Sequence, residues 1–267
     1  GTSNLDIVDI DGAVDMATTL AVAGNVDFNG DLDVDGTTNL DAVDVDGAVN
    51  FAADVTFADG ADIITASAGT QNTRIGEGAG DSIESGGNYN TVMGYNAGTA
   101  ITTGDENTAI GRVALATLTT GSWNTVVGTG AGNAVTTGVS NVAMGVNALV
   151  ATTTGDFNVA LGTFSLDANT TADNNTAVGY ASLGANTTGA QNTAVGGRSQ
   201  EATTTGGDNT SIGWGSLVLN TTGASNTALG RSSLAANTTA SNNTAVGYTA
   251  LLANTTGTQN VAVGANA

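Results

Sequence analysis

The chain of 267 residues contains no proline, cysteine, histidine or lysine. Without cysteine it can form neither a disulfide framework nor a thiolate metal site. Without histidine it lacks the commonest general base and metal ligand. Proline has no N–H group to give to a β-ladder, so its absence suits continuous hydrogen bonding between strands. Aromatic residues make up only 4% of the chain, which favours a thin, ladder-like core over an ordinary globular one.

Positive charge is nearly absent as well. Four arginines stand against 24 acidic residues, which gives a net charge of −20. Nucleic-acid binding needs basic patches, and anionic membrane surfaces repel an acidic chain. No apolar run approaches the ~18 residues that a membrane-spanning helix requires. We therefore expect no nucleic-acid partner and no insertion into a membrane.

A repeat of 17 residues fills the chain from residue 72 onwards. An asparagine, followed three residues later by an apolar residue and then by glycine, recurs with a first spacing of 18 residues and later spacings of 17. The asparagines are Asn72, Asn90, Asn107, Asn124, Asn141, Asn158, Asn175, Asn192, Asn209, Asn226, Asn243 and Asn260. A fixed period of this size indicates stacked coils that build their core together.

Each position of the coil, counted from its asparagine, has its own expected role. Position 4 is always apolar and position 9 is usually leucine, so we expect both to point inward. Position 5 is always glycine, which suits a tight corner or a close backbone approach. The asparagines at position 1 are expected to form a ladder between coils. Positions 13 and 14 are paired threonines in every complete 17-residue coil.

Residues 1–62 follow a different pattern. They carry fourteen aspartates and no basic residue, and apolar pairs such as Leu32/Val34 and Val49/Phe51 alternate with the period of a strand. The sequence therefore predicts an all-β chain: an acidic fibrous β-shaft over 1–62, a joint over 63–71, and a parallel β-solenoid over 72–267. Because such short strands cannot stand alone, and one chain offers few bulky residues per coil, we expect a homotrimer.

The repeat resembles two known families. Asn-Thr-Ala-Val-Gly at 175–179 and 243–247, followed by Ala/Ser-Leu, resembles the head repeats of trimeric autotransporter adhesins. That resemblance implies a left-handed parallel β-roll with three chains side by side, although the 17-residue period is longer than the commoner adhesin one. The runs Asn-Thr-Ala-Val-Gly-Tyr and Asn-Thr-Thr-Gly, and the acidic segment 26–36, are similar to phage tail fibres.

The resemblance implies a structural and adhesive fibre that contacts a glycan or protein on a host surface. We expect no enzymatic activity, because the repeat has no irregular inserted loop to build a cleft and offers no partner base. No autotransporter anchor or coiled-coil stalk is present, which favours a tail fibre of a virion, or another extracellular fibre, over an adhesin head on a bacterial cell. The chain starts without methionine and stops within a repeat, which suggests a piece of a longer protein.

Two other functions are weighed against the fibre. Threonine ladders on β-solenoids can bind ice, but adjacent threonines on a strand point to opposite faces, and only Thr152–Thr154 and Thr203–Thr205 give Thr-x-Thr. Two carboxylates flanking a sugar can hydrolyse a glycan, and the first coils are rich in acids. Solvated surface charge is the simpler interpretation of these acids: Glu77, Asp81, Glu84, Asp105 and Glu106.

The candidate ligand or interface residues occupy position 6: Tyr95, Arg112, Tyr180, Trp214, Arg231 and Tyr248. Arg231 is expected to lie between Trp214 and Tyr248 and to stack on both rings. This column is either packed between chains or open to a ligand.

No cofactor is expected apart from a possible calcium ion. Asp31, Asp33 and Asp35 match the first half of a calcium loop, but an EF-hand needs a glutamate at the twelfth position, where Ala42 stands. A solvated aspartate face is therefore favoured over calcium. Five glycosylation sequons, at Asn169, Asn186, Asn220, Asn237 and Asn254, follow from the repeat and predict no glycan in a bacterial or viral protein.

Overall fold

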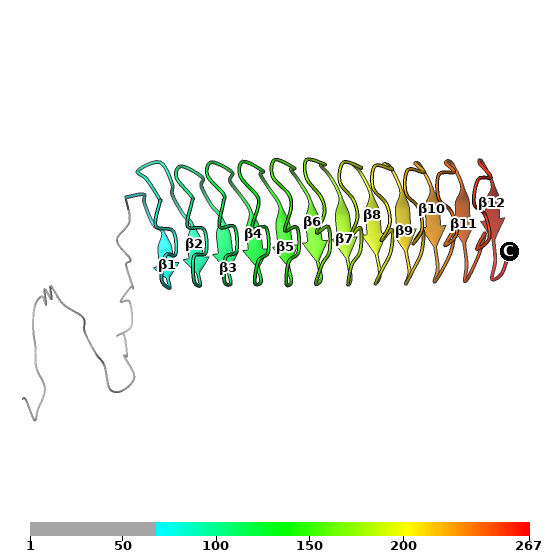
Figure 1. Cartoon of the computed structure of the whole chain (residues 1–267), viewed down its shortest axis with the longest axis horizontal. Coiled ribbons are helices and arrows are strands. Elements are labelled where there is room, and N and C mark those ends of the chain that lie inside the picture. The colour runs from blue at the N-terminus through cyan, green and yellow to red at the C-terminus, as the bar shows by residue number, and fades with distance from the viewer. Residues whose placement is uncertain (1–67) are drawn as a thin grey trace, which may run out of the picture. The chain divides into compact units, whose positions relative to one another are not determined.

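The computed structural model of the chain describes residues 68–267. The acidic shaft, most of the joint and the calcium candidates Asp31, Asp33 and Asp35 lie outside the described residues. The described residues form a parallel β-solenoid with one three-residue strand per coil (Figure 1). The strands are β1 Thr73–Ile75, β2 Thr91–Met93, β3 Thr108–Ile110, β4 Thr125–Val127, β5 Val142–Met144, β6 Val159–Leu161, β7 Thr176–Val178, β8 Thr193–Val195, β9 Thr210–Ile212, β10 Thr227–Leu229, β11 Thr244–Val246 and β12 Val261–Val263.

All twelve strands belong to one sheet, in sequence order from β1 to β12. Each strand is parallel to the next, and equivalent coil positions pair directly, as Thr227 does with Thr244. Only β1 and β2 are offset by 18 residues, where Thr73 pairs with Thr91. The prediction of an all-β solenoid with 17-residue coils is confirmed for this part of the chain.

The core differs from the prediction at position 4. Position 9 is buried, as Leu149 and Leu183 show, but position 3 is buried on the strand in place of position 4. Because side chains alternate along a strand, burial of position 3 turns positions 2 and 4 outward. Ile75, Met144 and Ile212 at position 4 are accordingly 50%, 49% and 43% exposed. The prediction that position 4 points inward was wrong. Position 3, which is mostly alanine, is the most buried position of each strand, although its side chain is usually smaller than the one at position 4.

Positions 3 and 9 compensate each other in volume. Most coils combine alanine at position 3 with leucine at position 9, but Val92 is matched by Gly98, and Val126 by Gly132. A Cβ on Gly98 would lie 2.7 Å from Cγ1 of Val92, so the two positions fill the same space. Close-packed interiors accept such exchanges when the total volume is kept. The glycines that interrupt the leucine column are therefore part of the packing.

Backbone conformation also explains those glycines. The residue at position 9 has a left-handed backbone conformation in every coil that reaches this position. Its φ is 57° at Leu149, 52° at Leu183 and 56° at Gly132. This region is costly for residues with a Cβ and free for glycine. Leucine at this position gains its burial in return, so glycine and leucine are the two natural solutions.

Glycine at position 5 serves two requirements at once. Gly179 has a φ of +128°, and a Cβ there would lie 2.7 Å from the carbonyl carbon of Gly196 in the next coil. The same close approach recurs along the column. The predicted tight corner and close backbone approach are both confirmed.

Buried asparagines form the predicted ladder at position 1. In a typical step, Asn107 Oδ1 accepts hydrogen bonds from the backbone N–H and the side-chain amide of Asn124, both 3.0 Å long. The amide of Asn124 also donates to the carbonyl of Gly138, at 2.9 Å. Each side chain thus ties its own coil closed and joins it to the neighbouring coil.

A second ladder, which was not predicted, runs along position 12. The sequon residues Asn169, Asn186, Asn220 and Asn237 are fully buried there, and Asn237 donates to Asn220 Oδ1 at 2.9 Å. Thr203 interrupts this column, and Asn186 Oδ1 has no hydrogen-bond partner. These sequons are therefore interior structural residues in the folded solenoid.

Candidate functional site

The outward side of the sheet is a regular surface, which we call the strand face and define by positions 2 and 4 of β1 to β12. Nine strands begin with threonine at position 2, and the other three begin with valine. Position 4 adds a parallel row of aliphatic residues. Its most exposed members are Ile75, Met93, Met144, Ile212, Leu229 and Val263. Large apolar side chains thus stand in a continuous row outside the core.

The position-6 column follows each strand after the glycine corner. Tyr95, Tyr180, Trp214 and Tyr248 are each about half exposed. The predicted stack is present: the guanidinium carbon of Arg231 lies 5.4 Å from the ring centre of Trp214 and 5.9 Å from that of Tyr248. Such contacts orient an arginine without neutralising it.

The other position-6 candidates are not brought into this stack. Thr129, Val146 and Thr163 separate Tyr95 and Arg112 from Tyr180 in the column. Tyr180 instead meets Phe164 edge to face, with ring centres 6.2 Å apart and an interplanar angle of 81°. The position-6 candidates therefore form two separate groups. Tyr95 and Arg112 belong to the early coils, and Tyr180, Trp214, Arg231 and Tyr248 belong to the later coils.

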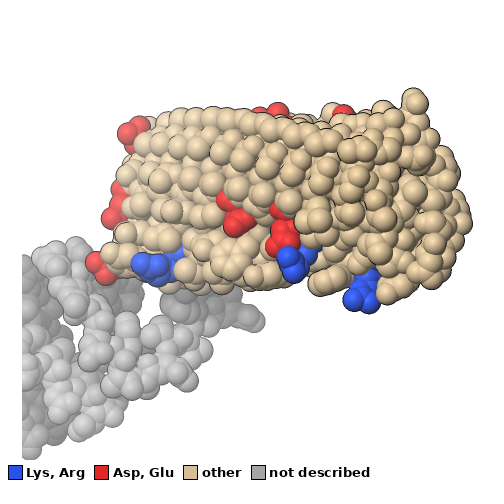
Figure 2. Space-filling model, turned by 45° about the vertical axis from the view of Figure 1, so that its right-hand side comes forward, with Lys and Arg blue, Asp and Glu red and all other residues tan. Residues whose placement is uncertain are grey.

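Charge is unevenly distributed along the solenoid. The last acidic residue is Asp208, and residues 209–267 carry Arg231 as their single charge. Figure 2 shows the coils nearest the viewer on the right without red acidic atoms. Two ion pairs lie before this segment: Arg74 with Asp81 at 2.8 Å, and Arg198 with Glu201 at 2.7 Å. The final coils form a neutral to slightly basic end of a strongly acidic chain.

Several acids have structural partners. Asp105, at position 16, accepts the backbone N–H of Asn88 at 2.7 Å. Asp156 and Asp173 occupy the same position in later coils and accept backbone N–H groups in the same way. Asp167 is different, because desolvation by burial raises the pKa of its carboxyl group above the usual value. Within residues 68–267, no group of three or more acidic side chains is arranged to hold a metal ion.

The paired threonines at positions 13 and 14 do not form a flat face. Thr153 at position 13 donates its hydroxyl to the carbonyl of Thr170 in the next coil, at 3.2 Å, while position 14 is exposed. In the two Thr-x-Thr segments, Thr152 and Thr203 are fully buried. The expected pair of outward threonines is therefore absent from both, and the regular threonine row lies instead at position 2.

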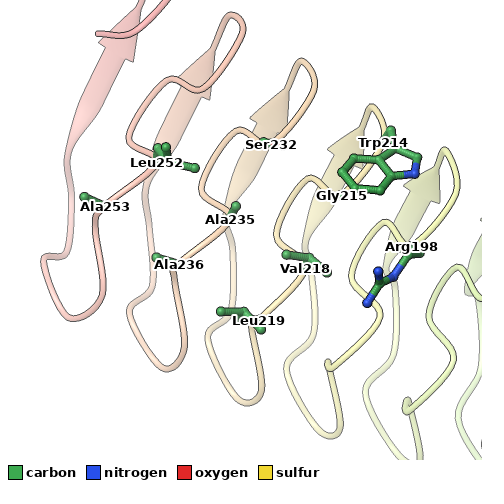
Figure 3. Close-up of a pocket in the computed structure, with 10 residues that line it drawn as sticks. All are labelled: Arg198, Trp214, Gly215, Val218, Leu219, Ser232, Ala235, Ala236, Leu252 and Ala253. Carbon is green, nitrogen blue, oxygen red and sulfur yellow. The ribbon is translucent and has the colours of Figure 1, made fainter.

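A shallow groove crosses the last four complete coils (Figure 3). Its volume is about 480 Å³ and its floor contains the small residues Ala235 and Ala236. Trp214, Leu219 and Leu252 stand around this floor. The groove was not predicted, although the sequence carries a signal for it: positions 10 and 11 hold leucine only in these coils, as Leu219 and Leu252, on either side of the Ala235–Ala236 pair.

Comparisons with known proteins return no match to any family model, curated protein or solved structure. Among the described residues there is also no helix long and apolar enough to cross a membrane.

Proposed function

We propose that this chain is a structural and adhesive rod within an extracellular fibre, assembled from three copies and resembling a phage tail fibre that contacts a host surface. A trimeric adhesin head on a bacterial cell is the related alternative. The observation that carries the proposal is the aliphatic row at position 4, which a single solenoid leaves in contact with water along its whole length.

The strand face is long and narrow. Twelve strands spaced by ~4.8 Å give a length of roughly 55 Å, and positions 2 to 4 span roughly 7 Å. Their product, roughly 400 Å² per chain, is about half of the ~800 Å² that each partner contributes to a standard stable interface. Association through this face would bury the aliphatic row, at ~25 cal/mol for each Å² of apolar surface removed from water.

The proposal is tested by the solution mass of the chain, measured by light scattering. Three chains are expected for the unchanged protein. Ile212→Asp and Met144→Asp place charges in the strand face and should reduce the mass to one chain without altering the β-sheet circular dichroism. Thr205→Asp, on the exposed position 14, is the matched control and should leave the mass unchanged. A monomeric unchanged protein would overturn the assembly.

A second function is favoured by one observation, the outward threonine row at position 2. Nine threonines on a parallel sheet, each followed two positions later by an apolar residue, form a regular surface of the kind that orders water into ice. Ice binding predicts a monomer that shows thermal hysteresis, reduced by Thr193→Tyr or Thr210→Tyr. A trimer without hysteresis would leave the fibre as the remaining interpretation.

A further inference from the structure

Another cavity, which shares no lining residue with the groove, lies on the three coils of residues 158–208. Its volume is about 410 Å³. Asp167 and Glu201 contribute two carboxylates to its wall, and Phe164 and Tyr180 contribute two aromatic rings. The other residues that line it are glycine and alanine, and no basic side chain is among them.

The cavity follows from the residues at position 10. Asp167, Gly184 and Glu201 occupy this position in three successive coils, so the backbones of the two acids are roughly 9.6 Å apart. The other 17-residue coils hold neither an acid nor a glycine at position 10. Gly184 does not have a positive φ, so the backbone conformation does not call for glycine here. Its missing side chain leaves an opening between two carboxylates.

The carboxylate of Asp167 lies at this opening. A Cβ built on Gly184 would lie 3.3 Å from Oδ1 of Asp167. Neither of the two ion pairs within residues 68–267 includes this carboxylate. Burial is the largest cause of its raised pKa, as expected for a carboxylate that has lost water without gaining a cation. A cation in the opening would supply the missing partner.

The charge of the cavity calls for one positive charge. Glu201 Oε2 accepts a hydrogen bond from Nε of Arg198 at 2.7 Å, so that pair is neutral overall. Asp167 keeps its charge. The net charge of −20 attracts cations to the chain as a whole and repels anions. A single cationic group therefore balances the site.

The aromatic rings indicate which kind of cation fits. Phe164 and Tyr180 meet edge to face, with ring centres 6.2 Å apart, so each ring supports the other. Aromatic rings attract organic cations and offer apolar surface for an alkyl stem. A calcium ion would need six to eight oxygen ligands, and residues 68–267 contain no group of three acidic side chains arranged to hold a metal ion.

A lysine side chain combines the required features. Its ammonium group carries three hydrogen-bond donors and a compact charge, and its stem is a slender aliphatic chain. An amino sugar also carries an ammonium group, but it would place hydroxyl groups against the rings and the alanines. The cavity thus favours lysine over an amino sugar.

We propose that this cavity binds a lysine side chain of a partner protein, with the ammonium group in the opening at Gly184. The ammonium group donates to the carboxylate of Asp167, and the aliphatic stem lies against Phe164 and Tyr180. The chain contains no lysine, so another copy of it cannot supply this group. The proposal rests on the proposed adhesive function, for which it names the chemistry of one contact with a host protein.

The test is an NMR titration at low salt with Nα-acetyl-lysine methylamide. Asp167→Asn removes the charge, and Gly184→Val fills the opening with a residue that position 10 holds in two other coils. Asp208→Asn is the matched control, because it removes one exposed carboxylate outside the cavity. The same lysine acetylated at Nε tests the need for charge, and methyl glucosaminide tests the amino sugar. Circular dichroism checks that each variant keeps the fold.

The unchanged chain and Asp208→Asn should bind the lysine derivative with similar affinity. Asp167→Asn and Gly184→Val should each weaken binding about fivefold or more, because charge-assisted hydrogen bonds and ring contacts are lost. The Nε-acetylated derivative should not bind.

The site is refuted if the lysine derivative does not bind, if the acetylated derivative or the glucosaminide binds at least as well, or if Asp208→Asn weakens binding as much as Asp167→Asn. It is also refuted if Asp167→Asn changes the solution mass, because the cavity would then belong to an interface between copies. A three-chain mass without lysine binding removes this site and keeps the fibre. Lysine binding by a monomer keeps the site and removes the three-chain assembly.

Discussion

Gly196 and Gly197 are neighbours in the chain, yet alanine should have very different effects at the two positions. Gly196 belongs to the position-5 column and has a φ of +126°. A Cβ there would lie 2.7 Å from the carbonyl carbon and 2.8 Å from the carbonyl oxygen of Gly213. The contacts are with backbone atoms of the next coil, so no side-chain rotation can relieve them. At Gly197 the nearest contact would be an ordinary 3.4 Å.

The expected magnitudes follow from these contacts. A strained backbone conformation costs ~1–3 kcal/mol, and overpacking adds ~1–3 kcal/mol, so Gly196→Ala should lower the free energy of unfolding by at least about 3 kcal/mol. Gly197→Ala should change it by no more than about 0.5 kcal/mol, as is usual for tolerant surface positions. Urea denaturation followed by circular dichroism measures both. Equal effects of the two substitutions would refute the account of the glycine column.

Three further substitutions test the interior and the charge. Thr203→Asn should stabilise the solenoid by about 1 kcal/mol in urea denaturation, because an amide there can donate to the unpartnered Asn186 Oδ1; an unchanged or lower stability would contradict the second ladder. Val126→Ala and Gly132→Leu should each destabilise, while the double variant recovers ~0.5–3 kcal/mol of coupling; strict additivity would refute volume compensation. Burial raises the pKa of Asp167, so its contribution to stability is full below the unfolded value and is lost as pH rises through the folded value. Asp167→Asn should therefore be more stable than the unchanged chain at pH 7 and lose that advantage near pH 3, and an advantage confined to acid would contradict the assigned cause.

The sequence predicted which residues align in successive coils more reliably than it predicted which of them point into the core. The period, the parallel coils, the glycine corner and the position-1 ladder depend on repetition, which is visible in the residues. The predicted direction of position 4 was wrong because Ala109 and Ala177 at position 3 look like weak core residues next to Ile110 and Val178. In a coil this narrow, leucine at position 9 already fills the interior, so only a small side chain fits opposite it. The second asparagine ladder was missed because its residues match a glycosylation sequon.

The candidate site was partly predictable. The Trp214–Arg231–Tyr248 stack follows from equal positions in successive coils, since the fixed register brings them together. The groove could not be derived in the same way, because its depth depends on how Ala235 and Ala236 lie between larger residues of the neighbouring coils.

The central claim is that other copies of the chain cover the strand face. Because the protein contains no cysteine, a single introduced thiol reports cleanly on its surroundings. The decisive measurement is the rate of maleimide labelling of Ile212→Cys, compared with Thr205→Cys on the exposed position 14. The account predicts strong protection at 212 that disappears when Met144→Asp is added, with free labelling at 205 throughout. Equally fast labelling at both positions in the unchanged background would contradict it.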